Sequence, residues 1–260
     1  MSGRLIVYFH GVPGSSAEIA HFQDMAQVHG VRLVAPDRFT LMPDLTGDDY
    51  FHALAKRVDE LAAGEGVELV GFSMGAFVAL RAVPFITTQI HRLHLISAAA
   101  PLESGEFFDH MAGKPVFKMA MRSEALLRRV ARLQGWLARL APGLLFRMLF
   151  ASAQGEDAGL SRDADFRSMI GCVLKSSLGP GLAGYVRDIA EYVQPWSHTL
   201  AAVSCETQIW HGAQDNWSPF GMAEVLRALL PNAAPVEVLA GASHYSSLKR
   251  AITRLLPAEN

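Results

Sequence analysis

The sequence has little cysteine and lacks the common motifs of metal-binding, nucleotide-binding and dinucleotide-binding proteins. It contains only two cysteines, Cys172 and Cys205, which lie far apart and in no CxxC spacing. This excludes a disulfide framework and suits a reducing compartment, so both cysteines are expected to be small buried hydrophobic residues. No HExxH, P-loop or dinucleotide-binding fingerprint occurs, so the sequence predicts neither a metal ion nor an organic cofactor.

Long uncharged apolar runs are also lacking. The stretch LARLAPGLLFRMLFASA comes closest to the roughly 18 apolar residues of a membrane span, but Arg139 and Arg147 interrupt it. The apolar run LIVYF near the N-terminus is too short for the central region of a signal peptide. We therefore expect a cytoplasmic protein without a membrane span.

Neither sign of charge is in excess. The formal net charge of −2 gives no general electrostatic reason to bind nucleic acid or an anionic membrane. What is present is hydrophobic sequence, which makes up 50% of the 260 residues. A chain of this length and composition can bury a sizeable core, either as one large domain or as one core with an insertion.

Short apolar runs rich in Val, Ile and Leu recur along the chain, at 5–9, 31–36, 67–72, 92–98, 207–212 and 235–241. Their continuous hydrophobicity, without alternation, is typical of strands that are buried on both faces in a parallel sheet. Helical patterns separate them, at 15–30, at 48–66, directly after Ser73, at 218–232 and at the C-terminal end. We therefore expect an α/β fold with a mostly parallel open sheet of about six strands flanked by helices.

One segment breaks this alternation. From about Pro101 to His198 the sequence has no strand pattern, and helical patterns rich in apolar residues and arginine occupy 123–150 and 166–179. We expect a helical insertion at 101–198 between two parts of one core, 1–100 and 199–260. The arginines of the insertion are interpreted as a solvated face rather than an anion site.

The pentapeptide Gly-Phe-Ser-Met-Gly at 71–75 is the strongest candidate for chemistry. The pattern alone is weak, but a buried strand precedes it and a helix follows it, which is the setting of a nucleophile elbow. So sharp a turn strains the backbone of Ser73, and Gly71 and Gly75 remove side chains that would collide with the neighbouring strand or helix. The alternative is an ordinary strand-to-helix turn with a solvated serine.

A serine nucleophile needs a base, and the base needs a carboxylate to orient it. His244, after the last predicted strand, is the candidate base, and its alternative role is to cap the final helix. Asp215, directly after the strand at 207–212, is the candidate acid, and its alternative role is that of an ordinary loop residue. Glu103, after the fourth predicted strand, is the reserve acid.

Acyl transfer also needs donors that stabilise the developing oxyanion. The backbone amides of Met74, after the serine, and of Val12, in the turn after the first strand, are the candidates. His10 is interpreted as a residue that shapes this loop. Trp217 and Tyr245 flank the acid and the base in sequence and either line a substrate pocket or pack in the core.

The stretches HGVPGS, APDR, GFSMGA, WHGAQDNWSP and GASHYS, in that order, resemble the α/β-hydrolase superfamily over residues 5–100 and 205–256. The resemblance implies Ser73 as nucleophile, Asp215 as acid, His244 as base, Val12 and Met74 as oxyanion donors, and 101–198 as a cap over the site. A serine where some relatives carry aspartate argues against an epoxide hydrolase or dehalogenase. The family's usual first hairpin is absent, so the sheet edge near the N-terminus is expected to be open or paired with a second copy in a homodimer.

These observations predict a serine hydrolase that cleaves a carboxylic ester, or a related acyl bond, of a small and largely apolar substrate through an acyl-enzyme. The same residues would serve a carbon–carbon hydrolase acting on diketone-like compounds, a thioesterase or a lactonase. A receptor that keeps the pocket without turnover is the alternative from another class, although a pure binder would not need all three catalytic groups.

Overall fold

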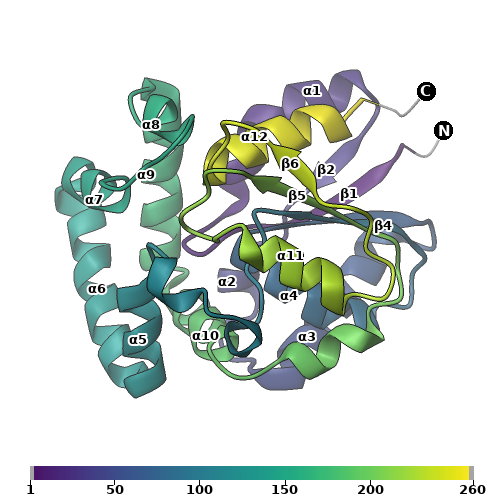
Figure 1. Ribbon diagram of the computed structural model, residues 1–260, viewed down its shortest axis with the longest axis horizontal. Coiled ribbons are helices and arrows are strands. Elements are labelled where there is room, and N and C mark those ends of the chain that lie inside the picture. Colours follow the sequence, from purple (N-terminus) through teal and green to yellow (C-terminus); the bar gives the residue numbers. More distant parts are fainter. Residues whose placement is uncertain (1–2, 258–260) are drawn as a thin grey trace.

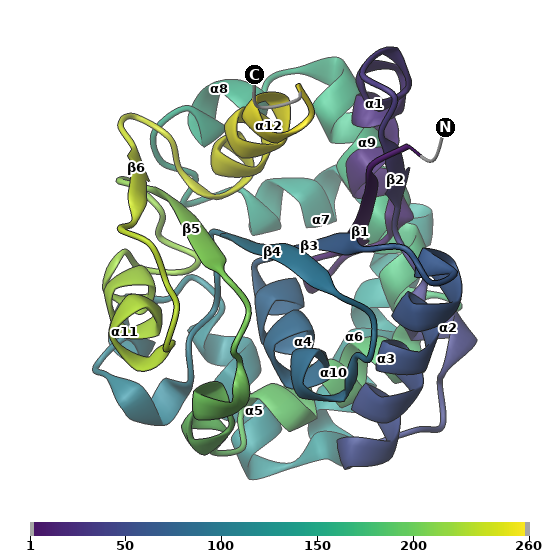
Figure 2. The ribbon, with the colours of Figure 1, turned by 90° about the vertical axis from the view of Figure 1, so that its right-hand side faces the viewer.

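The computed structural model describes residues 3–257, which contain an open six-stranded sheet in the order β2-β1-β3-β4-β5-β6 (Figure 2). Each strand pairs with its neighbours in parallel, so the expected fold class is confirmed. The strands are β1 (Leu5–Phe9), β2 (Arg32–Val34), β3 (Val67–Phe72), β4 (Ile90–Ile96), β5 (Thr207–Gly212) and β6 (Glu237–Leu239).

Helices cover both faces of the sheet, which explains the continuous hydrophobicity of the inner strands. All five residues of β1 are buried, as are those of β3 except the half-buried Glu68. α1 (Gln23–Val28) and α12 (His244–Leu255) lie on one face, and α3 (Gly47–Ala62), α4 (Met74–Ala82) and α11 (Gly221–Leu229) lie on the other (Figures 1 and 2).

The two edge strands are short, because β2 and β6 have three residues each. β1 lies between β2 and β3, so the edge near the N-terminus is formed by β2 and not by the first strand. Short edges expose few unpaired backbone groups for another strand to use. Pairing of two copies along the sheet edge therefore stays a prediction with little backbone to support it.

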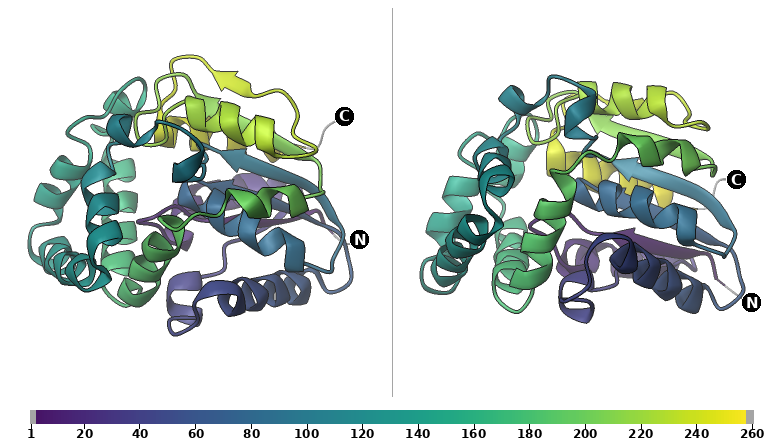
Figure 3. Two further views of the ribbon diagram at one scale, coloured as in Figure 1. Left: turned by 60° about the horizontal axis from the view of Figure 1, so that its bottom comes forward. Right: turned by 90° about the horizontal axis from the view of Figure 1, so that it is seen from below.

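The chain between β4 and β5 forms a layer of helices that lies beyond one end of the strands instead of over a face of the sheet (Figures 1 and 3). We call α5 to α10 the helical layer; as expected, residues 101–198 contain no strand. The predicted helix at 123–150 is interrupted at Ala141, because Pro142 has no N–H to continue it. The helices of the helical layer are α5 (Lys114–Arg122), α6 (Glu124–Leu140), α7 (Pro142–Leu149), α8 (Asp157–Leu160), α9 (Ala164–Leu178) and α10 (Leu182–Tyr192).

A buried ion pair ties the helical layer to the core. Arg38, at the start of α2 (Arg38–Leu41), donates from Nε to Oδ2 of Asp188 in α10 over 2.8 Å, and both side chains are 0% exposed. Arg187 donates from Nη2 to the other carboxylate oxygen, Oδ1, over 2.9 Å. A charge this deeply buried is tolerated when it is paired and hydrogen-bonded, so these three side chains fix α10 against the loop after β2.

Two expected helices need correction. α11 begins at Gly221 rather than at Ser218, because the Ser218 N–H donates to Asp215 and its carbonyl accepts from His211, which holds that residue in the loop. The segment 15–30 divides into a 3-10 helix, η1, and then α1. The 3-10 helices of the described chain are η1 (Ser16–Phe22), η2 (Val83–Phe85), η3 (Leu102–Ser104), η4 (Phe108–His110) and η5 (Ser197–Ala202).

The expected burial of the cysteines is also wrong. Cys172 is exposed and Cys205 is half-buried, and both are free thiols. Cys172 points outward because the apolar period of α9 places Ile170, Val173 and Leu174 on its inner side. Within residues 3–257, no helix combines the length and hydropathy that a membrane crossing requires.

Candidate active site

Ser73 lies at the end of β3, one of the two central strands, with a backbone φ of 56° and ψ of −126°. A non-glycine residue in this region is strained and persists only where its surroundings hold it. A Cβ on Gly71 would stand 2.6 Å from Cα of Ala76, and one on Gly75 would stand 2.0 Å from the carbonyl oxygen of Phe9. The helix and strand contacts predicted from the two glycines are therefore present.

The backbone N–H groups of Val12 and Met74 lie beside Ser73 and are free to donate a hydrogen bond to a ligand. Val12 follows β1, Met74 is the first residue of α4, and both line the same cavity as Ser73. Within residues 3–257 neither amide donates a hydrogen bond. Met74 has no intrahelical acceptor because the first turn of a helix leaves its N–H groups unpaired.

Asp215 and His244 form a buried hydrogen-bonded pair. Nδ1 of His244 lies 2.9 Å from Oδ2 and 3.1 Å from Oδ1 of Asp215. The Asp215 carboxylate also accepts from the backbone N–H groups of Trp217 and Ser218, each over 2.9 Å. Burial opposes the charge of Asp215, but the His244 ring and these hydrogen bonds outweigh it and lower the pKa of the carboxyl.

This pairing assigns the proton of the histidine. Because a carboxylate accepts only, Nδ1 of His244 donates and Nε2 is left as the basic nitrogen. Neither Nε2 of His244 nor the hydroxyl of Ser73 has a hydrogen-bond partner in the described part of the chain. The ring nevertheless lies close to the serine turn, since its centroid is 4.8 Å from that of Phe72.

The two aromatic residues expected near the acid and the base have different positions. The Trp217 ring stacks on the His244 ring, with centroids 5.3 Å apart and planes 14° apart, and it lines the cavity. Tyr245 is not among the described residues that line that cavity. Its ring packs instead against Phe150 and Phe166, at centroid distances of 5.7 and 5.4 Å.

A carboxylate that sequence reasoning missed holds the start of α12. Asp157, in α8, accepts from the N–H groups of Tyr245 and Ser246 over 2.9 and 2.8 Å, and from the Ser246 hydroxyl over 2.6 Å. An anion at a helix N-terminus satisfies unpaired donors and complements the helix dipole. Asp157 thus anchors the helix that carries His244, from a segment that has no recognisable motif.

The reserve acid and the loop histidine are occupied elsewhere. Glu103 accepts from the N–H groups of Trp196 and Ser197, each over 2.8 Å, and so fixes the chain leaving α10. His10 is fully buried, and its Nδ1 donates to the carbonyl of Gly11 over 3.0 Å. Burial lowers the pKa of His10, and the nearby Arg38 guanidinium lowers it further, so the ring is neutral.

A second residue without a sequence signal lies beneath the loop after β1. Oε2 of Glu18 accepts from the Tyr8 hydroxyl over 2.6 Å and from the Gly11 N–H over 3.1 Å. Oε1 of Glu18 is buried with no partner in the described chain. Burial raises the pKa of Glu18 from 4.5 to about 7, despite two hydrogen bonds that favour the carboxylate.

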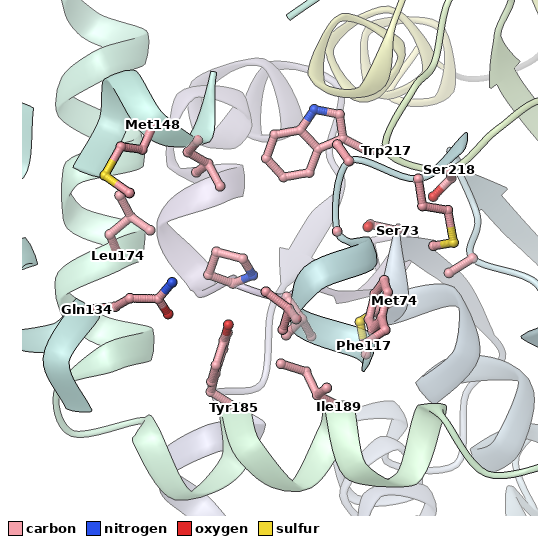
Figure 4. Close-up of a pocket in the computed structure, with 18 of the residues that line it drawn as sticks. Ser73, Met74, Phe117, Gln134, Met148, Leu174, Tyr185, Ile189, Trp217 and Ser218 are labelled. Carbon is pink, nitrogen blue, oxygen red and sulfur yellow. The ribbon is translucent and has the colours of Figure 1, made fainter. Parts of the chain in front are cut away.

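A cavity of about 200 Å³ separates the carboxyl edge of the sheet from the helical layer (Figure 4). The sheet side contributes Ser73 and the loops after β1, β4 and β5, while α5, α6, α7, α9 and α10 supply the opposite wall. None of the described residues that line the cavity carries a charged side chain. Most of the wall is apolar, with Met111, Val116, Phe117, Leu145, Leu174 and Ile189 among its members.

Two neutral polar side chains, carried by α6 and α10, interrupt the apolar wall that the helices form. Tyr185 of α10 and Gln134 of α6 both reach toward the cavity from the side opposite Ser73 (Figure 4). Tyr185 is buried, and burial raises the pKa of its hydroxyl, which therefore stays protonated. In residues 3–257 neither side chain has a hydrogen-bond partner. A ligand in the cavity would find a neutral donor and acceptor here.

These features define a class of protein: an open parallel α/β sheet with a serine on a strained turn at its carboxyl edge, followed in the chain by a paired aspartate and histidine. The chain belongs to the alpha/beta hydrolase family, whose model matches residues 6–256. The expected family resemblance is confirmed.

Solved structures agree with this fold. MenH from S. aureus is 18% identical with a TM-score of 0.71, covering 98% of this chain and 93% of that one. A thermophilic esterase from Thermogutta terrifontis is 19% identical with a TM-score of 0.67, and the match covers 98% and 88% of the two chains. A bromoperoxidase from Bacillus anthracis is 19% identical with a TM-score of 0.66, and the match covers 98% and 91%. No curated protein sequence matches the chain.

Proposed function

We propose that this protein is a serine hydrolase that cleaves a carboxylic ester through an acyl-enzyme. The observation that carries the proposal is the buried Asp215–His244 pair beside a serine held at positive φ on the wall of a cavity. A plain structural turn needs neither a strained serine nor a buried, oriented imidazole. Together they are the parts that activate a weak nucleophile near neutral pH.

In the first half-reaction, Nε2 of His244 takes the proton of Ser73 as Oγ attacks the ester carbonyl. The N–H groups of Val12 and Met74 stabilise the negative charge on the carbonyl oxygen. His244 then protonates the departing alcohol oxygen, and the acyl group remains on Ser73. In the second half, His244 deprotonates a water molecule that attacks the acyl-enzyme, and the proton returns to Ser73 as the acid leaves. Asp215 holds the tautomer and stabilises the charged ring.

The cavity supports a substrate class. A wall without charged side chains would leave a carboxylate or ammonium group unpaired and desolvated, so the substrate is uncharged where it contacts the wall. The apolar side chains fit an alkyl or aryl group. Tyr185 and Gln134 fit one neutral oxygen, such as a hydroxyl or keto group, remote from the reacting carbonyl. In this proposal 101–198 form a cap domain over a core of 1–100 and 199–260.

The test compares the purified protein with Ser73→Ala on short and medium-chain aryl esters. We expect turnover by the wild type, stoichiometric labelling by a serine-directed phosphonate, and loss of both in Ser73→Ala. Peptide mapping should locate the label on Ser73. If the wild type showed no turnover and no labelling, the esterase proposal would be overturned. Full activity in Ser73→Ala would overturn the choice of nucleophile.

A further inference from the structure

The charge of the chain is unevenly distributed. Residues 114–149, which span α5, α6 and α7, contain eight Lys and Arg residues and one acidic residue, Glu124, a formal charge of +7. Because the whole chain carries −2, the remainder carries −9. Glu124 pairs with Arg128. In the described chain the following arginines have no acidic partner: Arg122, Arg129, Arg132, Arg139 and Arg147.

Large apolar side chains lie among these arginines. On α6, Leu133 is 58% exposed, Trp136 58% and Leu140 65%, although side chains of this size are ordinarily covered. At 3.6 residues per turn, Leu126, Leu133, Leu140, Trp136, Arg129, Arg132 and Arg139 fall within an arc of about 140°. We call this side of α6, together with the exposed Leu144 and Met148 of α7, the outer face.

The outer face is not covered by any other part of residues 3–257. α6 packs through Leu127, Ala131, Gly135 and Ala138 against α9 and its other neighbours, so the opposite side of the helix points away from the core. Figures 1 and 3 show α5, α6 and α7 as the outermost helices on the side remote from the chain termini. The outer face is therefore a free surface that is both apolar and cationic.

We propose that the outer face binds an anionic lipid surface. Trp and Leu side chains enter the boundary between headgroups and acyl chains, while arginines reach the lipid phosphates from the same helix. A second copy of the chain is the competing occupant, but a two-fold contact would bring two segments of +7 together. An anionic bilayer instead offers opposite charge, at roughly a fivefold gain in binding for each arginine near the surface.

The outer face adjoins the cavity. Met148 is 61% exposed and also lines the cavity wall, and Gln134, on α6, lines it as well. A protein docked through α6 and α7 would thus hold one wall of its cavity against the lipid phase. Uncharged apolar compounds concentrate in that phase, so docking would supply ligands of the kind that the wall fits.

The test is sedimentation with phosphatidylcholine vesicles that contain or lack phosphatidylglycerol, at low and high salt. We expect the wild type to bind only the anionic vesicles, and salt to weaken this binding. Leu133→Gln with Trp136→Gln should weaken it at least about tenfold, and Arg129→Gln with Arg132→Gln roughly 25-fold. Val28→Gln is the control, since Val28 is 81% exposed on α1, away from the outer face; it should bind like the wild type.

The experiment measures binding and needs no turnover, so its result is independent of the esterase proposal. It can therefore be repeated with Ser73→Ala. Absence of binding to anionic vesicles, or equal binding by the control and both double variants, would overturn the proposal. A lipid-free dimer in analytical ultracentrifugation that Leu133→Gln with Trp136→Gln dissociates would assign the face to a second copy and overturn it too.

Discussion

The carboxyl edge of the sheet and the helical layer face each other across one cavity, but they hold their polar groups in different ways. At the sheet edge the Asp215 carboxylate accepts from two backbone amides and a histidine, and the strained Ser73 turn is backed by two glycines. In the helical layer, Tyr185 and Gln134 point into the cavity without a partner in the described chain. In the proposed function the sheet edge performs the chemistry, while the helices select the ligand.

The largest effect should come from disrupting the sheet edge. Asp215→Asn keeps the shape of the side chain but lets an amide face Nδ1 of His244, which favours the wrong tautomer. We expect kcat to fall roughly 10⁴-fold. Glu103→Gln is the matched control, because Glu103 binds the backbone of Trp196 and Ser197 instead. Steady-state ester hydrolysis measures both, and a near-normal rate for Asp215→Asn would refute the assignment of the acid.

The next largest effect concerns the tie between the two regions. Asp188→Asn removes the charge that compensates Arg38 and Arg187, leaving buried guanidinium groups unpaired. We expect the free energy of unfolding in urea to fall by about 3–5 kcal/mol. Asp48→Asn, which breaks an exposed pair with Arg81, should cost at most about 1 kcal/mol. Equal losses for the two variants would mean that the buried tie contributes no more than a surface pair.

The comparison of the two regions also explains what could be predicted from sequence. The strands were predictable because burial on both faces produces continuous apolar runs, and the positions of Ser73, Asp215 and His244 because each lies in the turn or loop that follows such a strand. That these three residues lie at one edge of the sheet then follows from a general rule, that the carboxyl ends of parallel strands meet there. The family was predictable from the same local motifs.

The partners that come from the helical layer could not be predicted. Asp188 meets Arg38 across 150 positions, and Asp157 meets Ser246 across 89. Such contacts depend on how the helices pack against the core. The local sequence around a carboxylate that becomes buried in this way does not differ from that around a solvent-exposed carboxylate of an amphipathic helix. The net charge of the whole chain also gave no sign of the cationic helices, because a total of −2 conceals a segment of +7. The arginine-rich face was correctly placed toward solvent, but its exposed leucines were not foreseen.

A third prediction tests the buried carboxyl at the sheet edge through pH. The folded pKa of Glu18 is about 7, above its ordinary value of 4.5, so the folded state holds a proton that the unfolded state has lost. Its contribution to stability is therefore complete below pH 4.5 and declines as the pH rises toward 7, by roughly 3 kcal/mol in total. Glu18→Gln is neutral throughout and should lack this loss. Urea unfolding of both proteins from pH 4.5 to 8 measures it, and parallel curves would contradict the prediction.

The smallest effect should come from the helical wall, and it depends on the substrate. Tyr185→Phe removes one hydroxyl and leaves the ring that packs beside Ile189, so the volume of the cavity is almost unchanged. For an ester with a hydroxyl or keto oxygen on the part that reaches Tyr185, we expect kcat/KM to fall roughly tenfold, as one hydrogen bond of about 1.5 kcal/mol is lost. For the matched ester without that oxygen it should not fall, because the phenylalanine no longer leaves a buried hydroxyl unpaired. Equal losses on both esters would show that Tyr185 only packs the wall, and the division between a reactive sheet edge and a selective helical layer would then fail at this residue.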